Sequence, residues 1–215
     1  NLAVNLKAIN SIPEAIKAYK NAIILKSNYV EAYNNLGLIF LEIEKFKEAK
    51  SYFIKALSLL SGPSSYAAFI NLGTTYKRLG DFKNAIDSYK KAIISNNKIP
   101  EGHFNLGIVY LIIGDTENSE FYFKKAISLK NDYTDAHRQI SLIRKYKTSD
   151  NHFNSLKRLY SNQTLSINQK CHINFALAKA YDDTEQFDKA FKHYKEGNQQ
   201  RKKILNYTID LDINH

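Results

Sequence analysis

This 215-residue sequence has no tryptophan, no methionine and one cysteine. A single cysteine excludes an internal disulfide, and we expect Cys171 to be a small buried side chain. No apolar run approaches the roughly 18–20 residues that span a bilayer, so we expect no membrane partner. No secretory signal is visible at the start, which favours a cytoplasmic protein. The absence of methionine indicates a segment of a longer chain.

Proline and glycine are also scarce, at three and eight residues. Little length is therefore left for loops, which favours helices joined by short turns. The apolar fraction of 44%, with fifteen tyrosines and twelve phenylalanines, is enough to bury a core. The formal net charge of +10 suggests an acidic or anionic partner. Lysines that coat solvent-facing helix surfaces would give the same charge, and this explains most of it.

Three of the eight glycines follow the same dipeptide, in Asn-Leu-Gly at residues 35–37, 71–73 and 105–107. The three leucines and Ile140 stand 36, 34 and 34 residues apart. Aromatic residues follow the second and third leucines at a distance of four, which places both side chains on one helix face. The glycine beside each leucine removes side-chain bulk where a second helix must approach. This periodicity predicts an internal repeat.

A second pattern completes each repeat, with alanine, an aromatic residue four positions later and alanine three further on, as at Ala85, Tyr89 and Ala92. Such a small-large-small stripe complements the leucine-glycine face of the first helix. Between the two patterns, Gly80 is expected to end one helix and Asp81 to cap the next. The unit is therefore predicted to be a helical hairpin of about 34 residues.

This pattern of Leu-Gly and Ala-aromatic-Ala positions resembles the tetratricopeptide repeat, whereas it fits the pentatricopeptide repeat poorly. The resemblance implies an all-α fold, a right-handed α-solenoid superhelix of stacked hairpins. About six repeats are expected, with a terminal capping helix near residues 199–206 and a linker at 207–215 towards an absent domain. The predicted repeats are 1–29, 30–63, 66–99, 100–133, 134–168 and 171–204. The fifth is expected to pack irregularly, because Arg144 replaces an aromatic residue of its first helix.

The recurring asparagines are not explained by helix packing. Asn35, Asn71 and Asn105 each precede a buried leucine by one residue, about 100° around the helix. We expect them to face the concave side of the array as a ladder of amides that pairs with the backbone of an extended peptide. The ladder resembles that of O-linked N-acetylglucosamine transferase. Alternatively, these asparagines are polar residues that a wet helix face tolerates.

Other residues predicted on the concave face are mostly basic. They are Thr74, Lys77, Arg78, Arg138, Lys145 and Lys179, opposed by Glu42, Asp182 and Asp183. A carboxylate clamp of the chaperone-adaptor kind is not expected, because Ile70 and Thr74 hold the positions that need lysine and asparagine. This wall favours an extended segment that is acidic or phosphorylated.

No catalytic, metal or cofactor site is predicted. Cys171 and His172 are adjacent and point about 100° apart on a helix, so they cannot chelate one metal together. Core packing is the expected role of His103 and His137. Asp182 and Asp183 are interpreted as exposed acids at a helix end.

The last third of the chain resembles the segment that precedes the catalytic domain in bacterial tetratricopeptide-repeat sulfotransferases. The matching run is Glu196-Gly197-Asn198, followed by a basic helix and Tyr207. This resemblance implies a non-catalytic region that recruits a partner or substrate for a sulfotransferase-like protein. Two alternatives stay open: a stand-alone adaptor or self-association module, and, less favoured, a helical repeat that binds single-stranded RNA. The oligomeric state cannot be predicted.

Overall fold

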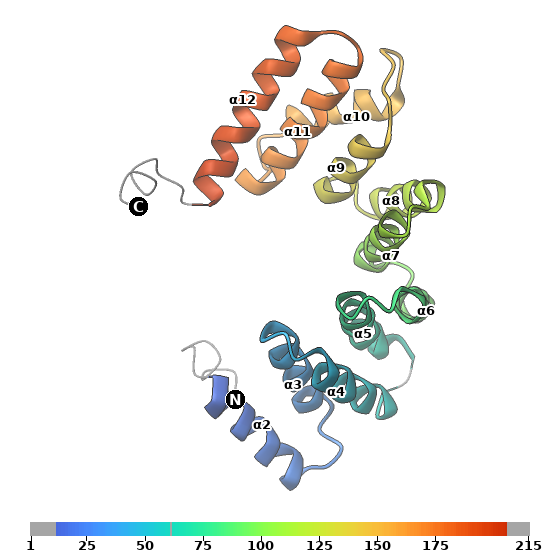
Figure 1. The fold of residues 1–215 in the computed structure, drawn as a ribbon, viewed down its shortest axis with the longest axis vertical. Helices are drawn as coiled ribbons and strands as arrows, with labels where there is room; N and C mark the ends of the chain where they lie inside the picture. The colour runs from blue at the N-terminus through green and yellow to red at the C-terminus, as the bar shows by residue number, and fades with distance from the viewer. Residues whose placement is uncertain (1–11, 61, 206–215) are drawn as a thin grey trace. The chain divides into compact units, whose positions relative to one another are not determined.

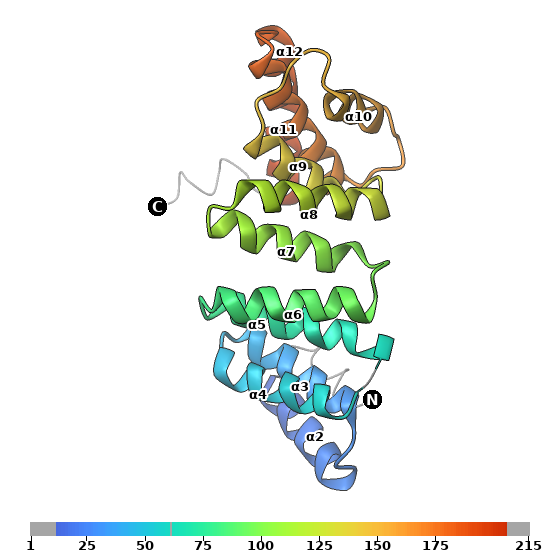
Figure 2. The same cartoon turned by 90° about the vertical axis from the view of Figure 1, so that its right-hand side faces the viewer.

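The computed structural model describes residues 12–60 and 62–205 of the chain. These residues form α-helices and one short 3-10 helix, with no strand among them (Figures 1 and 2), which confirms the predicted all-α fold class. The chain divides into two compact units, residues 1–119 and 120–215. The start of the first predicted repeat, residues 1–11, and the predicted linker lie outside the described residues.

The first unit is built from helical hairpins whose consecutive helices pack side by side (Figure 1). The first helices of neighbouring repeats also pack on each other, α3 on α5 and α5 on α7. The helices are α2 (Ile12–Leu25), α3 (Val30–Glu42), α4 (Phe46–Ser58), η1 (Gly62–Ser65), α5 (Tyr66–Arg78), α6 (Phe82–Ser95) and α7 (Pro100–Ile112). The next helix, α8 (Thr116–Leu129), crosses the boundary between the units.

Gly37 and Gly73 each face the aromatic ring of the partner helix in their hairpin. A Cβ atom built on Gly37 would lie 2.5 Å from the ring of Phe53, and one on Gly73 would lie 2.7 Å from Tyr89. Both rings are fully buried. The Leu-Gly and Ala-aromatic-Ala patterns therefore meet as the sequence predicts, and glycine is required because the two helices leave no room for a methyl group.

Four of the turns within the hairpins share one backbone conformation, with positive φ at the equivalent position. Gly80 and Gly114 have φ of 74° and 83°, while Glu44 and Glu185 take the position with φ of 59°. Asp81 then caps α6, because its side chain accepts a hydrogen bond from the backbone of Asn84 at 3.2 Å. The turn prediction from the Gly-Asp pairs is thus confirmed, and two repeats form the same turn without glycine.

The second unit contains α9 (Thr134–Ile143), α10 (Asn151–Tyr160), α11 (Ile167–Asp183) and α12 (Phe187–Ile204). α11 packs on α9, α10 and α12, so it is the centre of this unit. α12 runs without a break to Ile204, and residues 199–204 are its last turns rather than a separate capping helix. Cys171 is buried, as predicted.

Candidate functional site

The three repeated asparagines lie at equivalent positions on α3, α5 and α7, and each is half-buried. Their side-chain amides differ in their hydrogen-bond partners. The side chain of Asn35 hydrogen bonds to the hydroxyl of Tyr19, whereas Asn105 makes no side-chain hydrogen bond to another described residue. Each amide thus has different surroundings, and a ladder that pairs with a peptide backbone stays a prediction.

Asn71 is joined to a residue that the sequence did not single out. Its Nδ2 donates to Oδ1 of Asn34 at 3.1 Å, and this bond links the first helices of two successive repeats. Asn34 was missed because its position does not recur: Ile70 and Phe104 take its place in the next repeats. The neighbouring pair Asn34-Asn35 was the one available signal.

The surface between α3 and α5 is hollowed at both ends. A depression of about 310 Å³ lies at the start of α3, lined by Val30, Glu31, Asn34, Asn35, Leu60, Ser64, Ala67 and Ala68. A second one of about 340 Å³ lies at its end, lined by Leu38, Leu41, Glu42, Glu44, Phe46, Thr74 and Arg78. Since the Asn34–Asn71 bond joins the same two helices, we name this surface, from the first depression to the second, the α3/α5 seam. Both apolar and polar side chains line the two depressions and are available to a chain that lies along the seam.

Three of the predicted concave residues lie on α5. Thr74 shares a hydrogen bond with the hydroxyl of buried Tyr89 at 3.0 Å, and burial raises the pKa of Tyr89 to about 12. Lys77 is half-buried, and burial followed by the neighbouring charge of Arg78 lowers its pKa. Arg78 is exposed and lines the second depression. The guanidinium of Arg78 therefore lies at the second depression, which Glu42 and Glu44 also line.

The remaining predicted basic residues belong to the second unit and have separate environments. Arg138 of α9 lies over the ring of Phe175, with its guanidinium carbon 5.4 Å from the ring centre. Lys179 pairs with Asp183 on the same helix. Lys145 is exposed and does not lie on a helix, because α9 ends at Ile143. Lys145 therefore lies in the loop after α9, and its role in peptide binding stays a prediction.

The early end of α9 has a physical cause. Arg144 adopts an extended backbone with ψ of 151°, and Tyr146 is then drawn inward until only 2% of its surface is exposed. The backbone N–H of Tyr146 donates to Asp183 at 3.1 Å. Asp183 is thus a half-buried anchor for the loop, which corrects the prediction of an exposed acid at this position.

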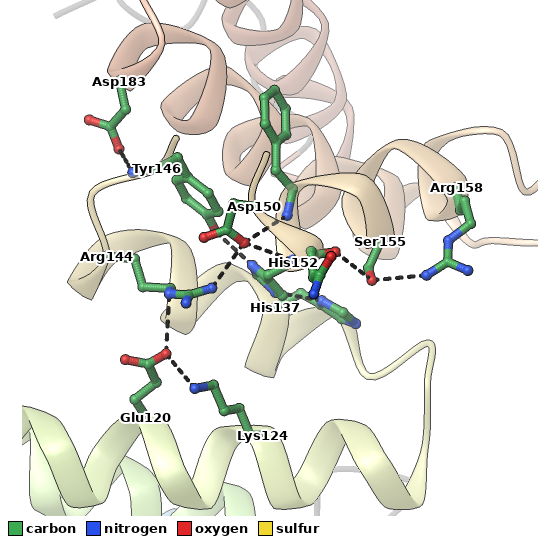
Figure 3. A network of polar contacts seen from close by, with 12 residues as sticks. Glu120, Lys124, His137, Arg144, Tyr146, Asp150, His152, Ser155, Arg158 and Asp183 are labelled. Carbon is green, nitrogen blue, oxygen red and sulfur yellow. Dashed lines mark hydrogen bonds and ion pairs between the residues drawn. The ribbon is translucent and has the colours of Figure 1, made fainter. Parts of the chain in front are cut away.

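A polar network closes the irregular fifth repeat (Figure 3). Arg144 lies between two carboxylates, with Nε 3.1 Å from Glu120 and Nη1 3.1 Å from Asp150. Asp150 also caps α10, because it accepts from the backbone of His152 at 2.7 Å. α10 packs on α11. These contacts tie the start of α10 to Arg144 and, through it, to Glu120 of α8, while the irregular packing of this repeat stays a prediction.

Two stacked imidazoles form the centre of this network. The carbonyl of Asn131 can only accept, so His137 Nε2 donates to it at 2.9 Å. In neutral His137, Nδ1 then accepts from His152 Nε2 at 2.9 Å. His152 Nδ1 accepts in turn from the hydroxyl of Tyr146 at 2.7 Å. The buried position predicted for His137 is confirmed, and its hydrogen bonds fix one tautomer of each ring.

The electrostatics of this chain of rings favour its neutral form. Burial lowers the pKa of His137. Burial and the neighbouring His137 lower the pKa of His152 to about 3. Burial also raises the pKa of the Tyr146 hydroxyl. The network is therefore structural at neutral pH, and it contains no nucleophile that is activated by an adjacent charge.

Searches of the described residues for two other kinds of site gave no candidate. They contain no group of three or more His, Cys, Asp or Glu side chains that could hold a metal ion. No helix among them is long and apolar enough to cross a membrane.

Comparison with known families agrees with the repeat pattern. Two family models described as "Tetratricopeptide repeat" match residues 28–98 and 100–133. A third, described as "TPR repeat", matches residues 6–43. These matches together cover more than half of the chain, which belongs to the tetratricopeptide repeat family. The predicted resemblance to sulfotransferase repeats has no counterpart among these matches.

Individual similar proteins share the fold at low sequence identity. An uncharacterized protein ycf37 from Pyropia yezoensis is 35% identical over 92 residues, which span 42% of this chain and 51% of that protein. The match therefore covers about half of that relative's length. The crystal structure of MamA is 20% identical, with a TM-score of 0.60 over 96% of this chain and 98% of that one. YrrB, described as a TPR protein with an unusual peptide-binding site, is 22% identical. Its TM-score is 0.56, and the match covers 90% of this chain and 88% of YrrB.

Proposed function

We propose that this chain is a scaffold that binds a protein partner through an extended peptide, which lies along the α3/α5 seam. The observation that carries the proposal is the pair of depressions at the two ends of the seam, on the two helices that the Asn34–Asn71 bond joins. Peptide binding in YrrB, a protein of similar fold, is consistent with it. The proposal assigns no catalytic role to the chain.

The amides of the seam match the chemistry of a peptide backbone. An asparagine side chain carries both a donor and an acceptor, and the Asn34–Asn71 bond uses one donor of Asn71 and one lone pair of Asn34. The groups that remain can pair with the N–H and C=O of one ligand residue. The depressions would receive ligand side chains, and Glu42, Glu44 and Arg78 in the second offer charges of both signs to a polar side chain that enters it.

A peptide-display library tests this function. Twelve-residue peptides would be selected on the full chain, and the affinity of the selected peptides would be compared between wild type and N71A. Loss of a hydrogen-bonding amide at the centre of the site should weaken binding about tenfold, since bonds of this kind contribute about 0.5–1.5 kcal/mol and the Asn34 partner is also disturbed. The matched control is N198A, which removes an exposed asparagine of α12. Equal affinity of N71A and N198A for every selected peptide would refute the seam as the binding site.

The finer assignment, recruitment for a sulfotransferase, is part of this proposal. Its support is the sequence resemblance alone; Glu196, Gly197 and Asn198 lie on α12, and Tyr207 lies outside the described residues. The coding sequence beyond His215 decides it. An open frame with a donor-binding loop rich in Gly, Ser or Thr supports this assignment, whereas its absence favours the stand-alone adaptor.

A further inference from the structure

The second unit contains a half-buried positive charge that no described carboxylate neutralises. Arg138 donates from Nη1 to the hydroxyl of Ser141 at 3.2 Å, and its guanidinium lies over the ring of Phe175. By contrast, Arg144 and Lys179, which are equally half-buried, each have a carboxylate as partner. A charge that leaves water without a counter-charge is costly, so the environment of Arg138 requires an explanation.

The carboxylates nearest to this region are engaged elsewhere. Asp135, one turn before Arg138, lies 3.6 Å from His172. Asp183 pairs with Lys179 and accepts from the backbone of Tyr146. Glu196 of α12 accepts from the hydroxyl of Tyr160 at 2.9 Å. None of these acids compensates Arg138 in the described part of the chain.

A second arginine, the exposed Arg201, lies on α12 near the point where this helix meets Phe175. A Cβ atom built on Gly197 would lie 3.3 Å from the ring of Phe175, so this ring lies against α12 at the glycine. Arg201 follows Gly197 by four residues and shares its helix face. Phe175 therefore relates two arginines. Arg138 lies over its ring, and Arg201 lies one helical turn after Gly197, which the ring contacts.

The pKa shifts of two nearby groups agree with this placement of the two arginines. Burial lowers the pKa of Arg138, and the charge of Arg201 lowers it further, while Tyr194 and Cys171 act in the opposite direction. At Cys171, burial raises the pKa of the thiol, and both Arg201 and Arg138 counteract this rise. Two positive charges therefore act on the surroundings of Phe175 and Cys171, and no carboxylate among the described residues forms an ion pair with Arg138.

We propose that Arg138 and Arg201 form a site for an anionic oxygen group, a carboxylate or a phosphate, of an acidic protein segment. An arginine that stacks on an aromatic ring keeps its planar edge of N–H donors free, and this edge matches the two oxygens of a carboxylate or phosphate. Tyr194, which is half-buried beside Arg138, adds a hydroxyl to the same region. The site would give the partner a second contact, specific for negative charge, outside the α3/α5 seam. Its assignment to a protein partner rests on the proposed function.

Titration of the full chain with simple anions tests the site. The probes are inorganic phosphate and an acetylated hexaglutamate peptide, and NMR follows the Nε–H signals of Arg138 and Arg201. We expect both signals to shift with both probes, and R138M and R201M to weaken binding about tenfold or more, since bonds between charged groups contribute about 1.5–3 kcal/mol. The control R158M removes an equal charge from the exposed surface of α10 and should leave the affinity within about twofold.

Stability distinguishes loss of the site from loss of the fold. Without added anion, R138M should unfold at the same temperature as wild type or higher, because it removes an uncompensated charge and keeps an apolar stem on Phe175. Equal losses of affinity in R138M and R158M, or unshifted Nε–H signals at saturating phosphate, would overturn the proposal. Tighter, Arg138-dependent binding of a single-stranded RNA oligonucleotide than of hexaglutamate would overturn the assignment to an acidic protein segment. Peptide binding that is lost in N71A and unchanged in R138M would refute this site and leave the α3/α5 seam intact.

Discussion

Asn71 donates a side-chain hydrogen bond to Asn34 at 3.1 Å, across the first helices of two successive repeats. The bond is half-buried and joins residues 37 positions apart in the sequence. It therefore couples neighbouring repeats by a polar contact, in addition to the apolar packing that holds each hairpin together. In a repeat protein, such contacts between neighbours contribute to the cooperativity of unfolding.

A double-mutant cycle on this pair should give a measurable coupling energy. We expect the variants N34A, N71A and N34A/N71A to show a coupling of about 0.5–1.5 kcal/mol in their free energies of unfolding, the usual net value of a partly buried hydrogen bond. Chemical denaturation monitored by circular dichroism measures it. The control cycle, N34A with N105A, should give a coupling close to zero. Equal couplings in the two cycles would show that the hydrogen bond contributes nothing of its own.

The close approach at Gly73 predicts a cost of added volume. In G73A, the new methyl group would meet the ring of fully buried Tyr89, which cannot move without disturbing the core. Overpacking of this kind costs about 1–3 kcal/mol, and the better helix propensity of alanine returns about 1 kcal/mol, so a net loss of up to about 2 kcal/mol is expected. G102A is the matched control, since its Cβ would lie 3.1 Å from the flexible side chain of Ile93. A stability of G73A equal to that of G102A would contradict the packing account.

The positive φ of Glu44 predicts a stabilising substitution. A left-handed backbone costs an ordinary residue about 1–2 kcal/mol, and glycine avoids this cost but loses more entropy on folding. E44G should therefore raise the free energy of unfolding by up to about 1 kcal/mol. G80A makes the opposite change at the equivalent turn and should lower it by a similar amount. Thermal and chemical denaturation test both variants, and a destabilised E44G would be inconsistent with strain at this turn.

The buried imidazoles predict acid sensitivity. The ordinary histidine pKa is 6.5, and His152 in the folded chain has a pKa of about 3. Below pH 6.5 the unfolded chain binds a proton that the folded chain does not, so stability falls as the pH drops from about 6.5 towards 3. The slope is at most about 1.4 kcal/mol per pH unit, or about 2 kcal/mol from His152 between pH 6.5 and 5.

Substitution of His152 isolates this effect. H152F should flatten the pH dependence of the free energy of unfolding between pH 7 and 5 by about the same amount, even though it loses stability at pH 7. H172Q, outside the network, should keep the wild-type slope. Denaturation curves at several pH values measure the slopes, and an unchanged slope in H152F would exclude the buried imidazole as its source.

The repeat and its packing were predictable because they depend on local periodicity. Leucine, glycine and the aromatic residue recur at fixed spacings, and each spacing corresponds to a helix face or a turn. Glu44 and Glu185 show the limit of this reading, since nothing in their side chains indicates a left-handed turn. Their conformation is imposed by the two helices on either side.

The polar contacts were harder to predict because they depend on where long side chains end. Lys179 was predicted to face a ligand, but its charge is taken up by Asp183 one turn later. Arg201 is exposed in the last turn of α12, and only its position one turn after Gly197 relates it to Phe175. Lys145 left its helix because the loop from Arg144 to Asp150 is held by contacts with residues distant in the sequence.

The most direct test of the central claim is an NMR titration of the full chain with a peptide selected from the library. The side-chain amide signals of Asn34 and Asn71 report on the α3/α5 seam itself, without any mutation. The account predicts that both signals shift in proportion to the occupancy of the peptide and return when unlabelled chain competes for it. Saturating peptide that leaves both signals in place while others shift would contradict the account.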